Sequence, residues 1–362
     1  MEKEIVIIQK TKVSSFPPLM AFMEYCKKTG VSIILICGNE FPSFMPFLEE
    51  NCSSVIMLNV DDAKPGILNK LYTWLKFNIK VWSAIRKNKL KNCTFYIPTA
   101  DTILAMGPRT KRLRYILNLY ELYDEAPVYL KHLRQYVAPA CLITCPDDTR
   151  AHIFRVWWNL KKTPLVIPNR PLSRPETDME APAFLSSFLE KIGSKKIIHY
   201  QGLITPDRGL EPIVQAVSKM SNYVLVLMGR KSEYLDKLLT MSDNIYHLPF
   251  VAPPQHLAVT KRASIGVLSY DHSCLNNIFC APNKIWEYSS LGVPMLGNDI
   301  PGLTKVIQSN RLGECADYDD VASIDKAIRK IENNLEEYSR NSYQYFDNVC
   351  MSELYDKVID AI

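Results

Sequence analysis

The sequence lacks the long apolar run that a membrane-spanning helix requires. No window of its 362 residues approaches the roughly 18 apolar positions of such a helix. The start, Met1 to Gln9, carries Glu2 and Glu4 where a signal peptide has basic residues. These absences predict a cytoplasmic protein, whose contact with a membrane would be peripheral, at the inner face of the cell membrane.

Motifs for disulfides, zinc and bound cofactors are also missing. None of the 10 cysteines belongs to a CxxC pair, and the six histidines are scattered without an HExxH motif. GxGxxG and the P-loop do not occur. The run Asp317-Tyr318-Asp319 fits a DxD metal motif, but a solvated acidic turn explains it as well. We expect reduced thiols, no metal and no cofactor.

Neither charge nor composition is typical of a nucleic-acid-binding protein. The chain has 43 basic and 38 acidic side chains, and its net charge is only +5. Apolar residues make up 47% and charged residues 22%, which is a globular composition. A chain of this length is too long for one ordinary core, so it predicts two domains. The weakly basic balance is compatible with anionic substrates or an acidic lipid surface.

Short apolar runs alternate with helical periods in both halves of the chain. Tyr223–Met228, for example, is a continuous apolar run, as expected for a strand that is buried on both faces. This alternation predicts an α/β fold of two doubly wound, Rossmann-like domains that face each other across a cleft. The other expected strands are Ile5–Ile8, Ser32–Cys37, Val55–Leu58, Thr94–Ile97, Tyr115–Asn118, Cys141–Thr144, Leu165–Ile167, Lys196–Tyr200, Ile245–Leu248, Ser264–Ser269 and Pro294–Gly297.

The domain boundaries follow from a proline-rich stretch without periodicity. Pro168, Pro171, Pro175 and Pro182 fall close together between the two alternating halves. We predict an N-terminal domain over residues 1–170, a linker over 171–182 and a C-terminal domain over 183–345. The tail is helical in pattern, and we expect its last segment, 346–362, to cross back to the N-terminal domain.

Two loops of the second half have the features of a phosphate-binding site. In the first, Gly202 allows close approach of the backbone to a ligand, and Arg208 adds a charged fork of donors before a new helix. In the second, Pro282 opens a helix that carries Lys284 and Glu287 on one face. Lys284 would meet a diphosphate and Glu287 a ribose diol. The alternatives are a turn with a surface arginine and a solvated Lys–Glu pair.

The stretch Ala281–Gly302, APNKIWEYSSLGVPMLGNDIPG, resembles the donor-site signature of GT4-type glycosyltransferases. That signature runs Pro-Asn-Lys, two apolar residues, Glu-Tyr, a Gly-x-Pro turn and then Pro-Gly. The loop from Gly202 to Gly209 resembles the phosphate loop of the same family. In the first half, Ala100–Leu104 and Leu119–Tyr123 resemble its Asp-x-x-Thr-Leu and His-Glu-Leu segments. The resemblance spans nearly the whole chain.

The resemblance implies a retaining, metal-independent glycosyltransferase of the GT-B fold that serves bacterial cell-surface polysaccharide synthesis. Its donor would be a UDP- or GDP-sugar, and its acceptor a glycan or a lipid-linked glycan. The implied donor-binding residues are Gly202, Leu203, Arg208, Gly209, Phe250, Val251, Asn283, Lys284 and Glu287. The implied catalytic groups are Arg208, Lys284, Glu121 and Asp101, and the implied acceptor-side residues are Tyr120 and Glu121.

Three positions depart from the family pattern. Phe279 stands where many relatives have an acidic residue, Leu203 where the phosphate loop often has arginine, and Tyr120 where the His-Glu-Leu segment has histidine. A non-catalytic relative that binds a nucleotide sugar or scaffolds a glycan-assembly complex therefore remains an alternative. A nucleotide-sugar epimerase on the same architecture is a further alternative.

Residues 64–91 combine apolar residues at helical spacing with many lysines and arginines. Leu68, Leu71, Leu75 and Ile79 recur on one face of the expected helix. A basic amphipathic helix of this kind is able to lie on an anionic membrane. The alternative is a helix that packs on its own sheet and exposes a solvated basic face.

Overall fold

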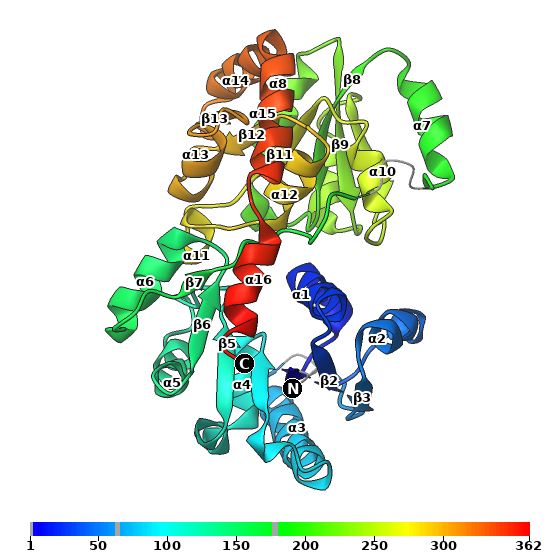
Figure 1. Cartoon of the computed structure of the whole chain (residues 1–362). Helices are drawn as coiled ribbons and strands as arrows, with labels where there is room; N and C mark the ends of the chain where they lie inside the picture. Colours follow the sequence, from blue (N-terminus) through cyan, green and yellow to red (C-terminus); the bar gives the residue numbers. More distant parts are fainter. Residues whose placement is uncertain (1–2, 62–65, 176–179) are drawn as a thin grey trace. The chain divides into compact units, whose positions relative to one another are not determined.

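The computed structural model describes residues 3–61, 66–175 and 180–362, and the chain divides into two compact units (Figure 1). Unit 1 comprises Met1–Leu172 and Cys350–Ile362, and unit 2 comprises Ser173–Val349. Part of the predicted linker, residues 176–179, lies outside the described residues, as does Lys64 at the start of the predicted basic helix.

Unit 1 is built on a sheet of seven parallel strands. Their order is β3-β2-β1-β4-β5-β6-β7, so the direction of winding reverses between β1 and β4. Residues Ile5–Ile8 of β1 are fully buried, as the continuous apolar run requires of a central strand. The strands are β1 (Glu4–Gln9), β2 (Ser32–Cys37), β3 (Ser54–Met57), β4 (Thr94–Ile97), β5 (Arg114–Asn118), β6 (Leu142–Cys145) and β7 (Leu165–Val166).

Helices of unit 1 connect these strands, and α16 joins them from the far end of the chain. Figure 1 shows α16 beside α1, and the Tyr25 hydroxyl of α1 donates to Asp356 of α16 at 2.5 Å. The helices are α1 (Pro17–Lys28), α2 (Met45–Asn51), α3 (Ile67–Lys87), α4 (Ala100–Met106), α5 (Pro127–Val137), α6 (Asp148–Trp158) and α16 (Met351–Ile359), with short 3-10 helices η1 (Val13–Ser15), η2 (Pro42–Phe44), η3 (Leu90–Asn92) and η4 (Pro108–Arg112).

Unit 2 repeats this plan on six parallel strands, in the order β10-β9-β8-β11-β12-β13. Here the winding reverses between β8 and β11. The strands are β8 (Lys196–Gln201), β9 (Tyr223–Gly229), β10 (Ile245–Pro249), β11 (Ile265–Leu268), β12 (Met295–Asn298) and β13 (Gly313–Ala316). The helices are α7 (Phe184–Ile192), η5 (Pro206–Arg208), α8 (Glu211–Ser218), α9 (Glu233–Leu239), α10 (His256–Thr260), α11 (Leu275–Ile278), α12 (Asn283–Ser290), α13 (Pro301–Ile307), α14 (Val321–Asn333) and α15 (Leu335–Asp347).

The two sheets confirm the predicted α/β class with two doubly wound domains. Every strand expected from the sequence overlaps a strand of the structure. One strand, β13, was not predicted from the sequence; it lies at the edge of its sheet and carries Glu314 and Cys315. Among the described residues, no helix is long and apolar enough to cross a bilayer.

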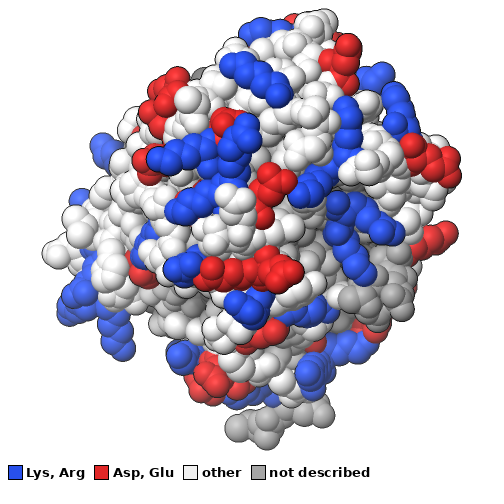
Figure 2. All heavy atoms as spheres, turned by 90° about the horizontal axis from the view of Figure 1, so that it is seen from above, with Lys and Arg blue, Asp and Glu red and all other residues white. Residues whose placement is uncertain are grey.

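Charges of both signs are interspersed over the face of the molecule shown in Figure 2. Some charged side chains of unit 2 form ion pairs, as Lys196 does with Glu332 at 2.7 Å and Arg329 with Asp325 at 2.8 Å. A mixed face of this kind is not typical of a nucleic-acid-binding surface, which presents a stripe of one sign.

Candidate functional site

The loop after β8 lies at the point where the winding of unit 2 reverses. Ligands of open α/β sheets bind beyond the carboxyl ends of the strands at such a switch point. Gly202 in this loop has φ +127°, a conformation that other residues rarely adopt. A Cβ atom at Gly202 would lie 3.0 Å from Lys284 Nζ. The glycine therefore allows the loop and the lysine to share one narrow space.

Lys284 enters this space from the first turn of α12, which begins after Pro282. Its Nζ lies 5.3 Å from the ring centroid of Tyr200 and 5.8 Å from that of Tyr270. Burial lowers the pKa of the ammonium to about 8, although the nearby Glu287 carboxylate raises it. Arg208 lowers this pKa further. Lys284 is therefore a cation that a bound anion would stabilise.

Arg208 brings a second cation to the same aromatic side chain. Its guanidinium carbon lies 4.8 Å from the Tyr270 ring centroid, and its Nε lies 3.4 Å from the Asp207 carboxylate. Its Nη1 is buried and has no hydrogen-bond partner among the residues that the structure describes. An unpaired buried donor costs free energy, so an incoming acceptor oxygen would be stabilised here. Lys284 and Arg208 together suit a diphosphate, since its charge satisfies both.

Glu287 lies one turn further along α12 and is held by a buried polar network. Its Oε2 accepts a hydrogen bond from Gln201 Nε2, and its Oε1 lies 3.6 Å from His256 Nε2. Burial by itself would raise the pKa of this carboxyl, but His256, Lys284 and Gln201 hold it below its ordinary value. The Gln201 amide is fixed in turn by Thr260, whose hydroxyl donates to Oε1 at 2.5 Å. Glu287 is therefore an oriented anion, the form that accepts hydrogen bonds from hydroxyl groups.

The remaining predicted donor residues lie around this cluster with different degrees of exposure. The Leu203 side chain is 63% exposed, and its backbone carbonyl accepts a hydrogen bond from the Tyr200 hydroxyl at 2.6 Å. Gly209 ends η5 in the left-handed conformation, and Asn283 is the half-buried first residue of α12.

The two residues predicted for a base pocket, Phe250 and Val251, follow β10. Phe250 is 54% exposed, and the Arg230 guanidinium lies 5.5 Å from its ring centroid. Val251 packs against the buried cluster beneath β9 and β10. Phe250 is thus the more exposed of these two side chains, and Val251 is half-buried.

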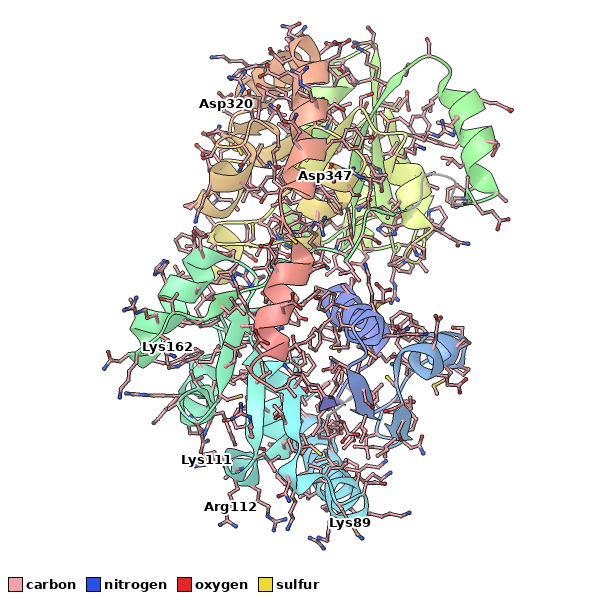
Figure 3. The ribbon with its side chains drawn as sticks, viewed as in Figure 1. Lys89, Lys111, Arg112, Lys162, Asp320 and Asp347 are labelled. Atoms are coloured by element: carbon pink, nitrogen blue, oxygen red, sulfur yellow. The ribbon has the colours of Figure 1, made fainter. Side chains whose placement is uncertain are left out.

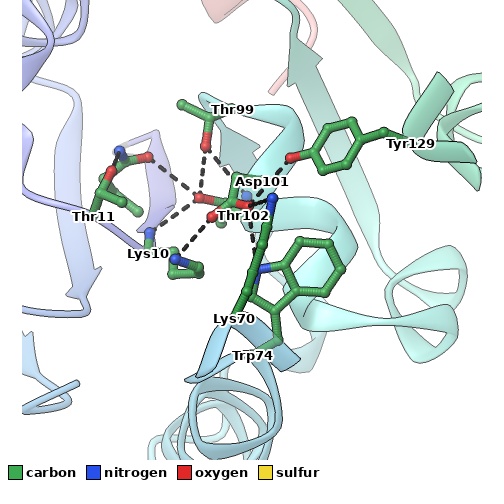
Figure 4. A network of polar contacts seen from close by, with 9 residues as sticks. Lys10, Thr11, Lys70, Trp74, Thr99, Asp101, Thr102 and Tyr129 are labelled. Carbon is green, nitrogen blue, oxygen red and sulfur yellow. Dashed lines mark hydrogen bonds and ion pairs between the residues drawn. The ribbon is translucent and has the colours of Figure 1, made fainter. Parts of the chain in front are cut away.

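In unit 1, Asp101 lies at the corresponding switch point between β1 and β4. Figure 4 shows its carboxylate at the centre of a polar network. The Lys10 ammonium lies 2.8 Å from Oδ2, while Oδ1 accepts from Trp74 Nε1 at 3.2 Å and from the Tyr129 hydroxyl at 3.3 Å. Lys70 lies 3.9 Å away. The Asp101 carboxylate is thus oriented by several partners and only partly exposed.

Tyr120 and Glu121 follow β5 in the same unit. Arg150 of α6 holds this segment, because its Nη1 donates to the Tyr120 carbonyl and lies 3.1 Å from Glu121 Oε2. The Tyr120 ring stacks on Phe16 at 5.9 Å, and burial raises the pKa of its phenol. Glu121 is the more open of the two, since half of its side chain is exposed.

Several residues of these sites were not predicted from the sequence. Gln201 and Lys10 each stand at or directly after a strand that borders a switch point, and that position is a signal that identifies them. His256, Thr260 and Trp74 carry no such signal, because they reach the sites from helices. In the described ranges 3–61, 66–175 and 180–362, no group of three or more His, Cys, Asp or Glu side chains is placed to hold a metal ion.

The geometry of unit 2 agrees with a comparison of the sequence with family models. Residues 185–345 match the family described as glycosyl transferases group 1. This range contains Gly202, Arg208, Lys284 and Glu287. In sequence, no curated protein matches the chain.

Solved structures of similar fold extend the likeness to the whole chain. A glycosyltransferase from Rickettsia africae superposes with a TM-score of 0.73 at 13% identity, over 99% of this chain and 98% of its own. Anabaena HepE, in complex with UDP and glucose, superposes with a TM-score of 0.73 at 11% identity over 99% of both chains. Sucrose-phosphate synthase from Thermosynechococcus elongatus gives 0.69 at 14% identity, over 99% and 95%. The fold is GT-B, and together with the family match it supports glycosyl transfer as the general activity.

Proposed function

We propose that the protein is a retaining, metal-independent glycosyltransferase of the GT4 type, which uses a UDP- or GDP-sugar as its donor. Its acceptor would be a glycan or a lipid-linked glycan of a cell-surface polysaccharide, met at an anionic membrane that it contacts peripherally. The observation that carries the proposal is the juxtaposition of Lys284 and Arg208 beside Gly202, at the switch point of a unit that matches glycosyl transferases group 1. Anabaena HepE, which shares the fold, is a structure in complex with UDP-glucose.

In this proposal the donor's diphosphate binds between Arg208 and Lys284. The buried Arg208 Nη1 and the Lys284 ammonium both gain a partner, and the backbone at Gly202 offers a close approach. The Glu287 carboxylate accepts hydrogen bonds from the ribose hydroxyls, because Gln201 and His256 keep it charged and fixed in orientation. Phe250, which is exposed after β10, stacks on the base.

The reaction breaks the bond between the anomeric carbon and the diphosphate oxygen and forms one to an acceptor oxygen on the same face of the sugar. The acceptor's proton passes to the departing phosphate oxygen, so no side-chain nucleophile is required. Negative charge grows on the diphosphate as the bond breaks. Lys284 and Arg208 stabilise that charge more strongly in the transition state than in the bound donor, which is the condition for acceleration.

Unit 1 would hold the acceptor in this account. Asp101 and Glu121 are oriented carboxylates at the carboxyl ends of β4 and β5, and each is able to accept a hydrogen bond from an acceptor hydroxyl. Tyr120, whose ring is stacked on Phe16, shapes the same edge of the sheet. These residues are positioning groups in the proposal, and the charge chemistry belongs to Arg208 and Lys284.

A turnover assay separates this proposal from a non-catalytic sugar-nucleotide binder. We expect purified protein to release nucleoside diphosphate slowly from one donor without acceptor, and faster when a lipid-linked glycan is supplied. The anomeric configuration of the product, read by NMR, should equal that of the donor. Binding without any release would favour the non-catalytic alternative, which Tyr120 and Leu203 keep open. An inverted product would contradict the retaining mechanism.

Gly202→Ala is expected to disturb the site directly. The added Cβ would lie 3.0 Å from Lys284 Nζ at a φ of +127°, so we expect a loss of about 1–3 kcal/mol in unfolding free energy. Nucleotide affinity should fall with it, because the lysine must move. Urea unfolding and calorimetric titration measure the two effects.

Gly193→Ala is the matched control for that substitution. Gly193 also has a positive φ, +61°, but apart from its chain neighbours no heavy atom of the described residues lies within 4 Å of its Cβ position. Gly193→Ala should therefore lower the unfolding free energy without changing nucleotide affinity. Equal nucleotide affinity in the Gly202 and Gly193 variants would argue against a ligand beside Lys284.

A further inference from the structure

Helix α3 exposes an unusual amount of apolar surface. We call the α3 face the set of large apolar side chains on this helix that are more than half exposed, namely Ile67, Leu68, Leu71, Tyr72, Leu75 and Ile79. Leu68 is 82% and Ile67 79% exposed. The set lies on one side of the helix, with successive members one, three or four residues apart, over roughly 18 Å. Other side chains of α3, which include Phe77, Val81 and Ala84, are buried in unit 1.

An apolar groove runs beside the α3 face. It lies between α3 and α5 and has a volume of about 630 Å³. None of its lining residues is acidic, and most of them are apolar or aromatic: Ile67, Lys70, Leu71, Trp74, Leu104, Gly107, Pro108, Ala126, Pro127, Val128, Tyr129, His132, Gln135 and Tyr136. Ile67 and Leu71 belong to both features, so groove and face form one continuous apolar surface.

Basic side chains border this surface. Lys70 Nζ lies 5.2 Å from the Trp74 ring centroid and 5.1 Å from that of Tyr129, at the wall of the groove. Lys111 donates to Gln135, a lining residue, at 3.4 Å. In Figure 3 the side chains of Lys89, Lys111 and Arg112 extend from the same end of unit 1. An apolar surface with a basic border is the pattern of a site for an anionic amphiphile.

We propose that the α3 face and the α3–α5 groove dock on a leaflet of anionic phospholipid, with one hydrocarbon chain in the groove and its phosphate beside Lys70. This deepens the peripheral membrane contact proposed above by naming the surface and the ligand class. The charge decides between two occupants of the surface. A second copy of the chain would present the same basic border, whereas an anionic headgroup layer offers charges opposite to those of Lys70 and Lys111.

Co-sedimentation with vesicles tests the proposal. Wild-type protein should bind phosphatidylglycerol-containing vesicles more strongly than phosphatidylcholine vesicles, and high salt should weaken the binding. A variant that combines Leu68→Gln, Leu71→Gln and Leu75→Gln should bind at least about tenfold more weakly, because three apolar side chains lose their burial. Lys70→Gln should weaken binding about fivefold, the contribution expected of one basic residue near an anionic surface.

Val156→Gln is the matched control. Val156 on α6 is 79% exposed, as the α3 residues are, but it lies outside the groove and the α3 face. Its replacement should leave vesicle binding unchanged. All these side chains are exposed, so the melting temperatures of the variants should match that of the wild type.

Trp74 provides a local readout, because it lines the groove. Brominated phospholipids should quench tryptophan fluorescence, and Trp74→Phe should remove most of that quenching. Unchanged vesicle binding in the triple variant would overturn the proposal. The proposal would also be overturned if the wild-type protein were a dimer, the triple variant were a monomer, and neither protein bound vesicles. The vesicle assay involves no sugar transfer, so a negative result would contradict the docking surface but not the proposed reaction, which the turnover assay tests.

Discussion

Replacement of Lys284 by alanine is expected to lower the rate of sugar transfer by about 10²- to 10³-fold. The expectation follows from loss of one preorganised positive charge at a buried site where negative charge develops, which costs about 3–4 kcal/mol of transition-state stabilisation. Nucleoside diphosphate binding should weaken as well, because one of the two cations beside Tyr270 that the proposal assigns to the phosphates would be lost. Steady-state kinetics and calorimetry measure the two losses.

Two controls separate the charge of Lys284 from its bulk. Lys326→Ala removes an exposed lysine of α14 and should change neither quantity. The pH dependence is the second control. The pKa of Lys284 is lowered to about 8, so its charged form declines as pH rises through 8, and wild-type affinity for a diphosphate should fall there. The alanine variant should show no such step near pH 8, and a step of equal size in both proteins would exclude Lys284 as its origin.

Replacement of Glu287 should affect both binding and stability. Glu287→Ala leaves Gln201 Nε2 and His256 without their partner, and unpaired buried groups cost about 1–3 kcal/mol of unfolding free energy. Nucleotide affinity should fall about 10- to 100-fold, because Glu287 is proposed to accept hydrogen bonds from the ribose hydroxyls. Each factor of ten corresponds to about 1.4 kcal/mol of binding free energy. Urea unfolding and calorimetric titration measure these changes. As a control, Glu190→Ala, which removes an exposed carboxylate of α7, should change neither the unfolding free energy nor the nucleotide affinity.

Glu287→Gln adds a more specific result. The carboxylate raises the pKa of Lys284 against the opposing effects of burial and Arg208. Its neutralisation should therefore move the pH at which diphosphate binding weakens from about 8 to a lower value. If the pH at which diphosphate binding weakens is the same in Glu287→Gln as in the wild type, the two side chains do not interact as the structure indicates.

The residues of the candidate site in unit 2 could be grouped from the sequence because they lie close together along the chain. Gly202 and Arg208 belong to one loop, and Lys284 and Glu287 to one helical turn, so spacing alone groups them in pairs. The partners that orient them were not predictable. Gln201 and His256 meet Glu287 only because β8 and α10 fold against α12, and no short-range pattern encodes that meeting.

The same distinction applies to unit 1. Asp101 was predicted only from the resemblance of Ala100–Leu104 to a family segment, and its ion pair with Lys10 joins positions that follow two different strands. The amphipathic pattern of α3 was evident, yet it could not show which apolar residues would be buried. Phe77 packs into unit 1 while Leu75, two positions earlier, stays 60% exposed. Strand β13 was missed because an edge strand needs no continuous apolar run.

The most direct test of the central claim is a calorimetric titration of UDP, GDP, ADP and CMP into the wild-type protein and into the Lys284→Ala and Glu287→Ala variants. The account predicts that one nucleoside diphosphate, UDP or GDP, binds well and that both substitutions weaken its binding by tenfold or more. That result would also name the base of the donor. Absence of binding by all four nucleotides, or affinity that neither substitution alters, would contradict the donor site and leave the α12 cluster as a purely structural feature.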